Sequence, residues 1–177
     1  MRPRERWLYI AAITALLLVV LLFGAVLFIP ILGHLGAPNY KSSLSNVKQQ
    51  ALGLLMYASD YDGRLPRADR WMDASAPYIR SDAIFIDPTL LDPEAGEYGF
   101  AFFRPLSGVA NEKVEQPEAT PLTFQSSDLS RNANGLLDLL PYRIKTKRGN
   151  VVSFADSHAA FMPESWRFEV IVIELPE

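Results

Sequence analysis

The feature that most constrains this chain is a long apolar segment near its N-terminus. From Trp7 to Tyr40 there is no Asp, Glu, Lys or Arg, and residues 8–29 contain only two polar side chains, those of Tyr9 and Thr14. A helix of that length extends about 33 Å, enough to cross the roughly 30 Å hydrocarbon core of a bilayer. The apolar region of a cleaved signal peptide is usually about 7–15 residues and ends at a small-residue cleavage site, which this sequence provides only poorly. The segment therefore predicts an uncleaved transmembrane anchor rather than a signal peptide.

The flanking charges predict how the chain is oriented in a membrane. Arg2, Arg4 and Arg6 precede the apolar segment with only Glu5 opposing them, and no basic residue follows before Lys41. Lys and Arg favour the cytoplasmic side of a membrane. We therefore expect a single-pass protein of the inner (cytoplasmic) membrane, with its N-terminus in the cytoplasm and its C-terminal part outside. The lipid bilayer is then a partner through the N-terminal helix.

The chain of 177 residues has room for one hydrophobic core besides the anchor. The expected organisation is a cytoplasmic basic tail at 1–6, a transmembrane anchor at 7–30, a Pro/Gly linker at 31–41 and an extracytoplasmic domain at 42–177. The absence of cysteine excludes disulfide scaffolds, thiolate zinc sites and thiol nucleophiles. A net charge of −3 argues against a nucleic-acid-binding protein.

An amphipathic helix is predicted directly after the linker, with Ser42 or Ser43 able to cap its start. Gly63 is expected to end it in the left-handed conformation, and Pro66 to prevent its continuation. One amphipathic helix cannot bury its apolar stripe alone, so we expect it to pack on a sheet. Apolar residues recur every three or four positions and define the stripe: Leu44, Val47, Ala51, Leu54, Leu55, Ala58 and Tyr61. The residues predicted to face outward are Lys48, Gln49, Gln50 and Ser59.

The rest of the chain predicts short strands. Asp156 and Ser157 form a plausible two-residue hairpin turn, although glycine is commoner at the second position. Sequential strands without intervening helices favour an antiparallel meander. The predicted fold class is therefore α+β, with an N-terminal transmembrane helix followed by an amphipathic helix packed on a small antiparallel sheet. The predicted strands are 84–86, 122–125, 150–155, 158–162 and 166–175, with a short helix or turn at 71–79 and a loop at 87–99. The aromatic residues Tyr98, Phe100, Phe102 and Phe103 are interpreted as core or loop-covering contacts rather than as a sugar site.

Several segments resemble those of a known family. Residues 46–49 and 55–66 are similar to the helix end of pilin-like proteins, especially the major pseudopilins of type II secretion. Residues 149–158 resemble the C-terminal signature of the prepilin-type processing-associated H-X9-DG proteins, and short pieces between these segments agree with that family. The resemblance covers about residues 46–162. It implies a pilin-like domain that acts by protein–protein contact, with envelope or secretion-system proteins as partners.

The chain also departs from the pattern of this family. Thr146 stands where the family has a His, and Ser157 stands where it has a Gly. Prepilins carry a Gly cleavage site followed by Phe-Thr-Leu-Ile-Glu, whereas residues 6–10 are Arg-Trp-Leu-Tyr-Ile and Glu5 precedes the apolar segment. A pilin-like domain on an ordinary membrane anchor is therefore the better description.

Few residues are candidates for catalysis or metal binding. Residues 60–63 resemble the opening of a calcium loop, but the twelfth position is Trp71 rather than Glu, so we prefer a helix-ending turn. Asp156 and His158 are the candidate metal ligands, and a metal would need at least one more. Ser157 beside His158 lacks the Gly-x-Ser-x-Gly context of a hydrolase. We predict no catalytic residue, no cofactor and no enzyme activity.

Two functional interpretations remain open. The leading one is a membrane-anchored, extracytoplasmic pilin- or pseudopilin-like protein that acts by protein–protein contact in the bacterial cell envelope. The alternative is a membrane-tethered ligand- or metal-binding domain that uses the hairpin around Asp156 and His158. A basic cluster at 145–148, with Arg143, could meet an anionic glycan or lipid surface, but a solvated loop is preferred because the predicted exported part is acidic.

Overall fold

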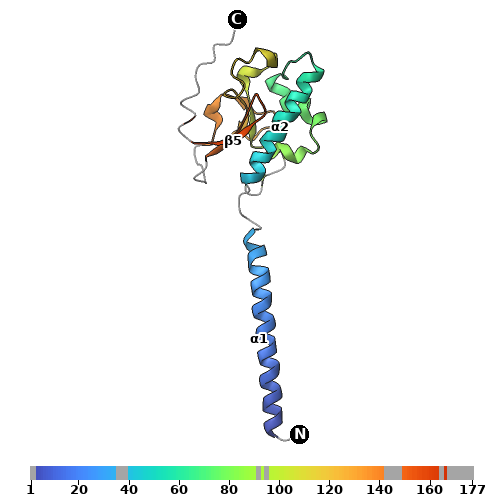
Figure 1. Ribbon diagram of the computed structural model, residues 1–177, viewed down its shortest axis with the longest axis vertical. Coiled ribbons are helices and arrows are strands. Elements are labelled where there is room, and N and C mark those ends of the chain that lie inside the picture. Colours follow the sequence, from blue (N-terminus) through green and yellow to red (C-terminus); the bar gives the residue numbers. More distant parts are fainter. Residues whose placement is uncertain are drawn as a thin grey trace. The chain divides into compact units, whose positions relative to one another are not determined.

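The chain forms two units. The computed structural model describes residues 3–34, 40–90, 93, 96–141, 149–163 and 166. The first unit, Met1–Ala37, contains the helix α1 (Pro3–His34). The second unit, Pro38–Glu177, contains the other described helices and strands (Figure 1).

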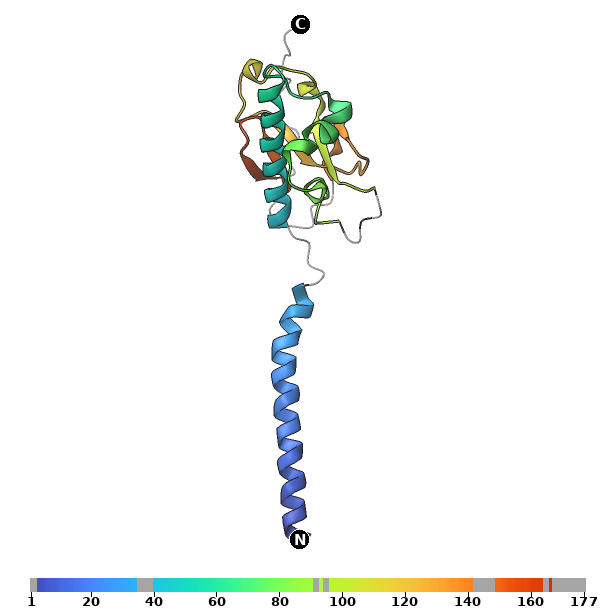
Figure 2. The ribbon, with the colours of Figure 1, turned by 90° about the vertical axis from the view of Figure 1, so that its right-hand side faces the viewer.

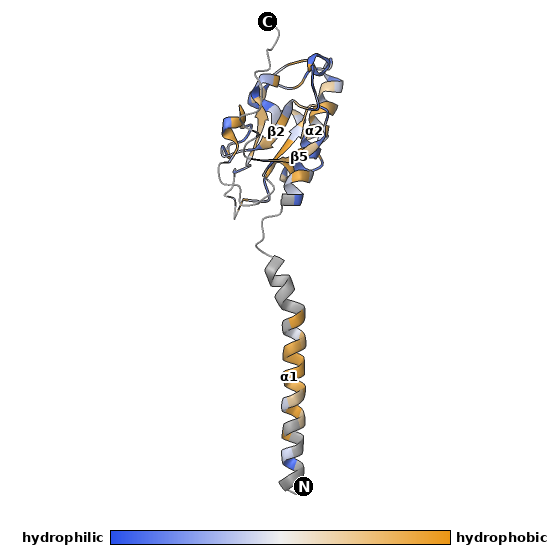
Figure 3. Cartoon of the chain, turned by 60° about the vertical axis from the view of Figure 1, so that its left-hand side comes forward, coloured by the Kyte–Doolittle hydropathy of each residue, from blue (hydrophilic) through white to orange (hydrophobic). Residues whose placement is uncertain are grey.

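The coloured part of helix α1 is mostly apolar (Figure 3), and the large apolar side chains described there are exposed. Trp7, Ile10 and Phe23 are 73%, 53% and 69% exposed. The predicted transmembrane helix at 7–30 is nevertheless wrong for the part of the chain that the structure describes, where no helix is long and apolar enough to cross a membrane.

Helix α2 (Tyr40–Asp60) is the predicted amphipathic helix. It buries Val47, Ala51 and Leu54 completely and packs across strands β2 (Pro121–Gln125), β4 (Asn150–Phe154) and β5 (Ala159–Met162). Figure 2 shows it lying along one side of this unit. Its end is also as predicted, because Gly63 has a φ of +72° and donates its N–H to the Ala58 carbonyl at 2.8 Å.

Two side chains were assigned to the wrong face of this helix. Tyr61, predicted to belong to the buried stripe, lies just beyond the end of α2 and is 53% exposed. Gln50, predicted to face solvent, is completely buried, and its Nε2 donates to the Ile84 carbonyl at 2.8 Å. Position 50 lies three residues after Val47 and four before Leu54, so helical geometry places it on the buried face. Its amide is tolerated there because a carbonyl from another segment accepts one of its N–H groups.

In the described part of the chain, five strands form one mixed sheet, rather than the predicted antiparallel sheet. The β1–β2, β2–β4 and β4–β5 pairs are antiparallel, but β3 runs parallel to β1. The reason is that β2 and β3, which follow each other in the chain, lie on opposite sides of β1. The segment between them is held to the β1 region by hydrogen bonds, including Phe102 N–H to the Ala133 carbonyl at 2.9 Å. The order is β3-β1-β2-β4-β5, with β1 at Phe100–Phe103, β2 at Pro121–Gln125, β3 at Asn134–Gly135, β4 at Asn150–Phe154 and β5 at Ala159–Met162.

Short helices fill most of the connections. The predicted helix or turn at 71–79 is confirmed as α3 (Trp71–Ser75) and η2 (Ala76–Tyr78), and the unpredicted 3-10 helix η1 (Ala68–Arg70) directly precedes it. The predicted strand at 84–86 is instead the 3-10 helix η3 (Asp82–Phe85), because the Ser81 hydroxyl accepts the Ala83 N–H and starts a helical turn. The remaining 3-10 helices in the described residues are η4 (Arg104–Leu106), η5 (Asn111–Lys113) and η6 (Leu137–Leu139).

The strands predicted at 122–125, 150–155 and 158–162 are confirmed as β2, β4 and β5. Strand β1 was not predicted, since its four apolar residues are all buried and show no alternation. The strand predicted at 166–175 lies outside the described residues except for Trp166, whose ring meets that of Phe154 edge-on. Residues 35–39 of the predicted linker and the basic cluster at 143–148 also lie outside the described residues.

Candidate functional site

The β4–β5 hairpin brings Asp156 and His158 together. The Phe154 N–H donates to the His158 carbonyl at 2.9 Å, and the Ser157 N–H donates to the Phe154 carbonyl at 2.9 Å. These bonds close a three-residue connection, 155–157, instead of the predicted two-residue turn. Ser157 occupies its left-handed position, with a φ of +74°.

The Asp156 side chain stabilises this turn by bonding to His158. Its Oδ1 accepts the main-chain N–H of His158 at 3.0 Å and lies 2.6 Å from the ring Nδ1. Partial burial acts to raise the pKa of Asp156, but the hydrogen bonds from His158 outweigh it and lower that pKa from its ordinary value. The His158 ring also stacks on Phe154, with ring centroids 4.2 Å apart.

A metal would need more ligands than this pair supplies. Within the described ranges, no group of three or more His, Asp or Glu residues lies close enough together to hold a metal ion. Asp156 and His158 are already hydrogen-bonded to each other, and this arrangement is suited to stabilising the turn. The calcium-loop alternative at 60–63 has a structural explanation, since the Asp60 Oδ2 accepts the Tyr78 hydroxyl at 2.7 Å and Gly63 ends the helix.

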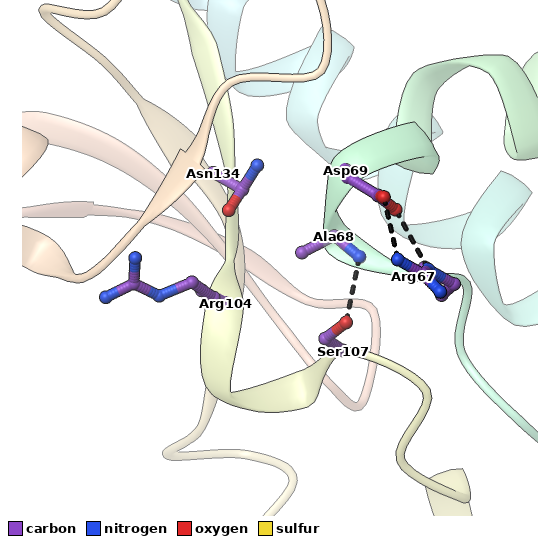
Figure 4. A pocket seen from close by; sticks show the side chains of 6 residues that line it. All are labelled: Arg67, Ala68, Asp69, Arg104, Ser107 and Asn134. Carbon is purple, nitrogen blue, oxygen red and sulfur yellow. Dashed lines mark hydrogen bonds and ion pairs between the residues drawn. The ribbon is translucent and has the colours of Figure 1, made fainter.

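A shallow polar depression of about 400 Å³ lies between η1 and η4 (Figure 4). Arg67 forms an ion pair with Asp69 across 2.9 Å, and the hydrogen bond from Arg67 lowers the pKa of Asp69. Arg104 extends from the end of β1, and its guanidinium has no hydrogen-bond or ion-pair partner among the described residues. The depression thus offers one uncommitted cation to an anionic group. Its lining consists of Arg67, Ala68, Asp69, Arg104, Ser107 and Asn134.

A cluster of tyrosines lies at the C-terminal end of α2. The rings of Tyr57 and Tyr61 stack with centroids 4.2 Å apart, and Tyr78 meets Tyr57 edge-on at 6.2 Å. The hydrogen bond from the Tyr78 hydroxyl to Asp60 raises the pKa of Tyr78 to about 12. Leu52 and Met56 are exposed on the same helix.

Close approach of two elements assembles this cluster. A Cβ atom on Gly53 of α2 would lie 2.6 Å from Cγ1 of Ile79, the residue that follows η2. Glycine at position 53 therefore lets Ile79 approach the α2 backbone. This contact brings the adjacent Tyr78 to Asp60. The cluster was not predicted from the sequence, because Tyr78 belongs to η2 and not to α2.

The buried carboxylate of Asp87 is the centre of a polar network. It accepts hydrogen bonds from the Ser43 hydroxyl at 2.7 Å, the Thr89 hydroxyl at 2.7 Å, the Thr89 N–H at 3.0 Å and the Gln125 Nε2 at 2.8 Å. Asp87 is only 4% exposed. All four donors belong to the chain itself, so this network is structural.

No family model, curated protein or solved structure matches this chain. The resemblance to pilin-like and H-X9-DG proteins therefore stays a prediction.

Proposed function

We propose that this chain is a pilin-like protein of the bacterial cell envelope that acts by protein–protein contact and not by catalysis. The observation that carries the proposal is the distribution of exposed apolar side chains on α2. While one face of this helix packs on the sheet, Leu52 and Met56 are 45% and 54% exposed, and Tyr61 just beyond its end is 53% exposed. Scattered apolar residues are normal on a protein surface, but a group of them on one helix is typical of an interaction site.

The surface of α1 supports the envelope location. Apolar side chains such as Trp7, Leu21 and Phe23 are more than half exposed in the isolated chain. Burying such side chains gains about 1.5–3 kcal/mol each, so α1 favours an environment that covers them, either lipid or other apolar helices. We propose that this requirement keeps the protein at the inner membrane.

Site-specific photo-crosslinking in cells tests this function. A photoreactive amino acid is placed, one position at a time, at exposed sites of the unit that α2 begins, including positions 56 and 136. We expect adducts of discrete mass from a contiguous group of positions, recovered with the membrane fraction. If no position across this unit gives an adduct, action by protein–protein contact is refuted.

A further inference from the structure

The exposed side of α2 near its C-terminal end combines apolar, aromatic and acidic groups. Leu52, Met56 and Asp60 follow each other at intervals of four residues, so they form one row along the helix. Asp60 connects this row to the tyrosines, because it accepts the Tyr78 hydroxyl. We call this region the tyrosine surface, and it consists of Leu52, Met56, Tyr57, Asp60, Tyr61 and Tyr78.

The negative charge of the tyrosine surface is not compensated within the described part of the chain. Asp60 and Asp62 lie at the end of α2 where the helix dipole is negative and favours cations, and α2 has no basic residue in its last turn. Neither carboxylate forms an ion pair among the described residues. The nearest basic residue in sequence, Arg64, donates instead to the Gly108 carbonyl.

The aromatic rings strengthen this preference for a cation. The face of a tyrosine ring carries negative potential and attracts Lys or Arg within about 6 Å of its centroid. One face of Tyr61 is covered by Tyr57, while Tyr61 as a whole is 53% exposed. A cation beside Asp60 can therefore meet a carboxylate and a ring at once.

We propose that the tyrosine surface docks a segment of a partner protein that places a Lys or Arg against Asp60 and Tyr61 and an apolar side chain against Leu52 and Met56. This inference rests on the proposed function, which requires a protein contact without specifying where it lies. The charge of the surface selects a basic partner, and its apolar row selects an amphipathic one.

Two synthetic helical peptides provide the first test, with the purified full chain in detergent. The peptides share the same leucines at intervals of four residues and differ only in carrying Lys or Glu beside them. We expect the Lys peptide to shift the amide resonances of residues 52–62 and to bind more weakly as salt is added. Equal binding of the Glu peptide, or shifts confined to other regions, would overturn the inference.

Matched variants separate charge from fold. Asp60→Asn removes the charge but keeps an oxygen that can accept the Tyr78 hydroxyl, so the ring geometry is preserved. It should weaken binding of the Lys peptide about two- to fivefold, as expected for an exposed ion pair. Asp138→Asn removes an exposed carboxylate in the middle of η6 and should leave binding unchanged. Equal effects of the two variants would mean that the site is elsewhere.

Photo-crosslinking in cells distinguishes failure of this inference from failure of the proposed function. Position 56 samples the tyrosine surface, and position 136, also exposed, samples the region next to β3. An adduct with another protein from position 56 that is lost with Asp60→Lys but kept with Asp138→Lys supports the inference. Adducts from position 136 alone, or an adduct of two copies of this chain at position 56, would overturn it and leave the proposed function intact.

Discussion

At the residue scale, Ser157 shows a conflict between side chain and backbone. Its φ of +74° lies in the left-handed region, where a Cβ costs about 1–2 kcal/mol. Glycine would remove that cost while adding about 0.5–1 kcal/mol of conformational freedom to the unfolded chain. We expect Ser157→Gly to stabilise the protein by about 0.5–1 kcal/mol in urea denaturation. Ser157→Ala, which keeps the Cβ, should give no gain, and a gain as large as that of glycine would show that the hydroxyl is responsible.

Substitutions at Asp156 and His158 distinguish a structural turn from a metal site. The lowered pKa of Asp156 means that its contribution to stability is present above the ordinary value of 3.8 and is lost as the pH falls through the lowered value. Asp156→Asn keeps an acceptor for the His158 N–H and should cost little, whereas Asp156→Ala should cost about 1 kcal/mol in thermal unfolding at neutral pH. A metal site predicts that Asp156→Asn and His158→Ala are equally damaging and that added metal stabilises only the unsubstituted protein.

Tyr78 should titrate later than an ordinary tyrosine. Because its pKa is raised from 10.0 to about 12, the hydrogen bond to Asp60 contributes to stability below pH 10 and is lost as the pH rises through about 12. The ultraviolet absorbance of tyrosinate should show a late-titrating group whose pKa returns toward 10 in Asp60→Ala. If Tyr78→Phe leaves the late-titrating group in place, the assignment to Tyr78 is wrong.

At the element scale, α2 offers a pair of leucines that differ mainly in environment. Leu54 is completely buried and Leu52 is 45% exposed. Leu54→Asp places an unpaired charge in the core and should reduce the free energy of unfolding by roughly 3–5 kcal/mol. Leu52→Asp should change it by no more than about 0.5 kcal/mol. Denaturant unfolding of both variants measures the difference, and a similar loss in the two would mean that α2 does not pack on the sheet through this face.

The predictable elements are those whose own residues show a periodic apolar pattern or a turn signal. The stripe of α2 and the end at Gly63 are local patterns, and the structure confirms the end and the buried stripe from Val47 to Ala58, but not its predicted last member, Tyr61. Elements that depend on distant partners were not predictable. The start of α3 is capped by the side chain of Asn132, whose Oδ1 accepts the Met72 N–H at 2.8 Å from far along the chain. The two-residue β3 has no sequence signal of its own, and its parallel pairing follows from the path of the preceding loop.

At the scale of the whole molecule, the same distinction applies to the candidate sites. The hairpin that carries Asp156 and His158 could be located from sequence because the two residues are neighbours. The tyrosine surface joins the end of α2 to Tyr78 of η2, and the polar depression joins Arg67 to Arg104. Such sites exist only after tertiary packing, so no local pattern reveals them.

The network around Asp87 ties several elements into one cooperative unit. Asp87 bonds Ser43 of α2 and Gln125 of β2, and the Gln125 Oε1 accepts the Val151 N–H of β4 at 2.8 Å. An Asn at position 87 has one acceptor oxygen in place of two, so Asp87→Asn leaves a buried donor unpaired. Hydrogen bonds to charged groups contribute about 1.5–3 kcal/mol. We expect a loss of about 2–4 kcal/mol of unfolding free energy, with faster hydrogen exchange in both α2 and β2.

A second substitution, at position 125, can restore the hydrogen bonding that Asp87→Asn disrupts. In the double variant Asp87→Asn with Gln125→Glu, the amide of position 87 can donate to a carboxylate at position 125, which can still accept the Val151 N–H. The double variant should therefore recover more than half of the stability that Asp87→Asn loses, a coupling that independent sites would not show. Exposed Asp138→Asn serves as the control and should change stability by no more than about 0.5 kcal/mol. If hydrogen exchange quickens only near residues 87–90, or if the two substitutions simply add, Asp87 does not couple α2 to the sheet.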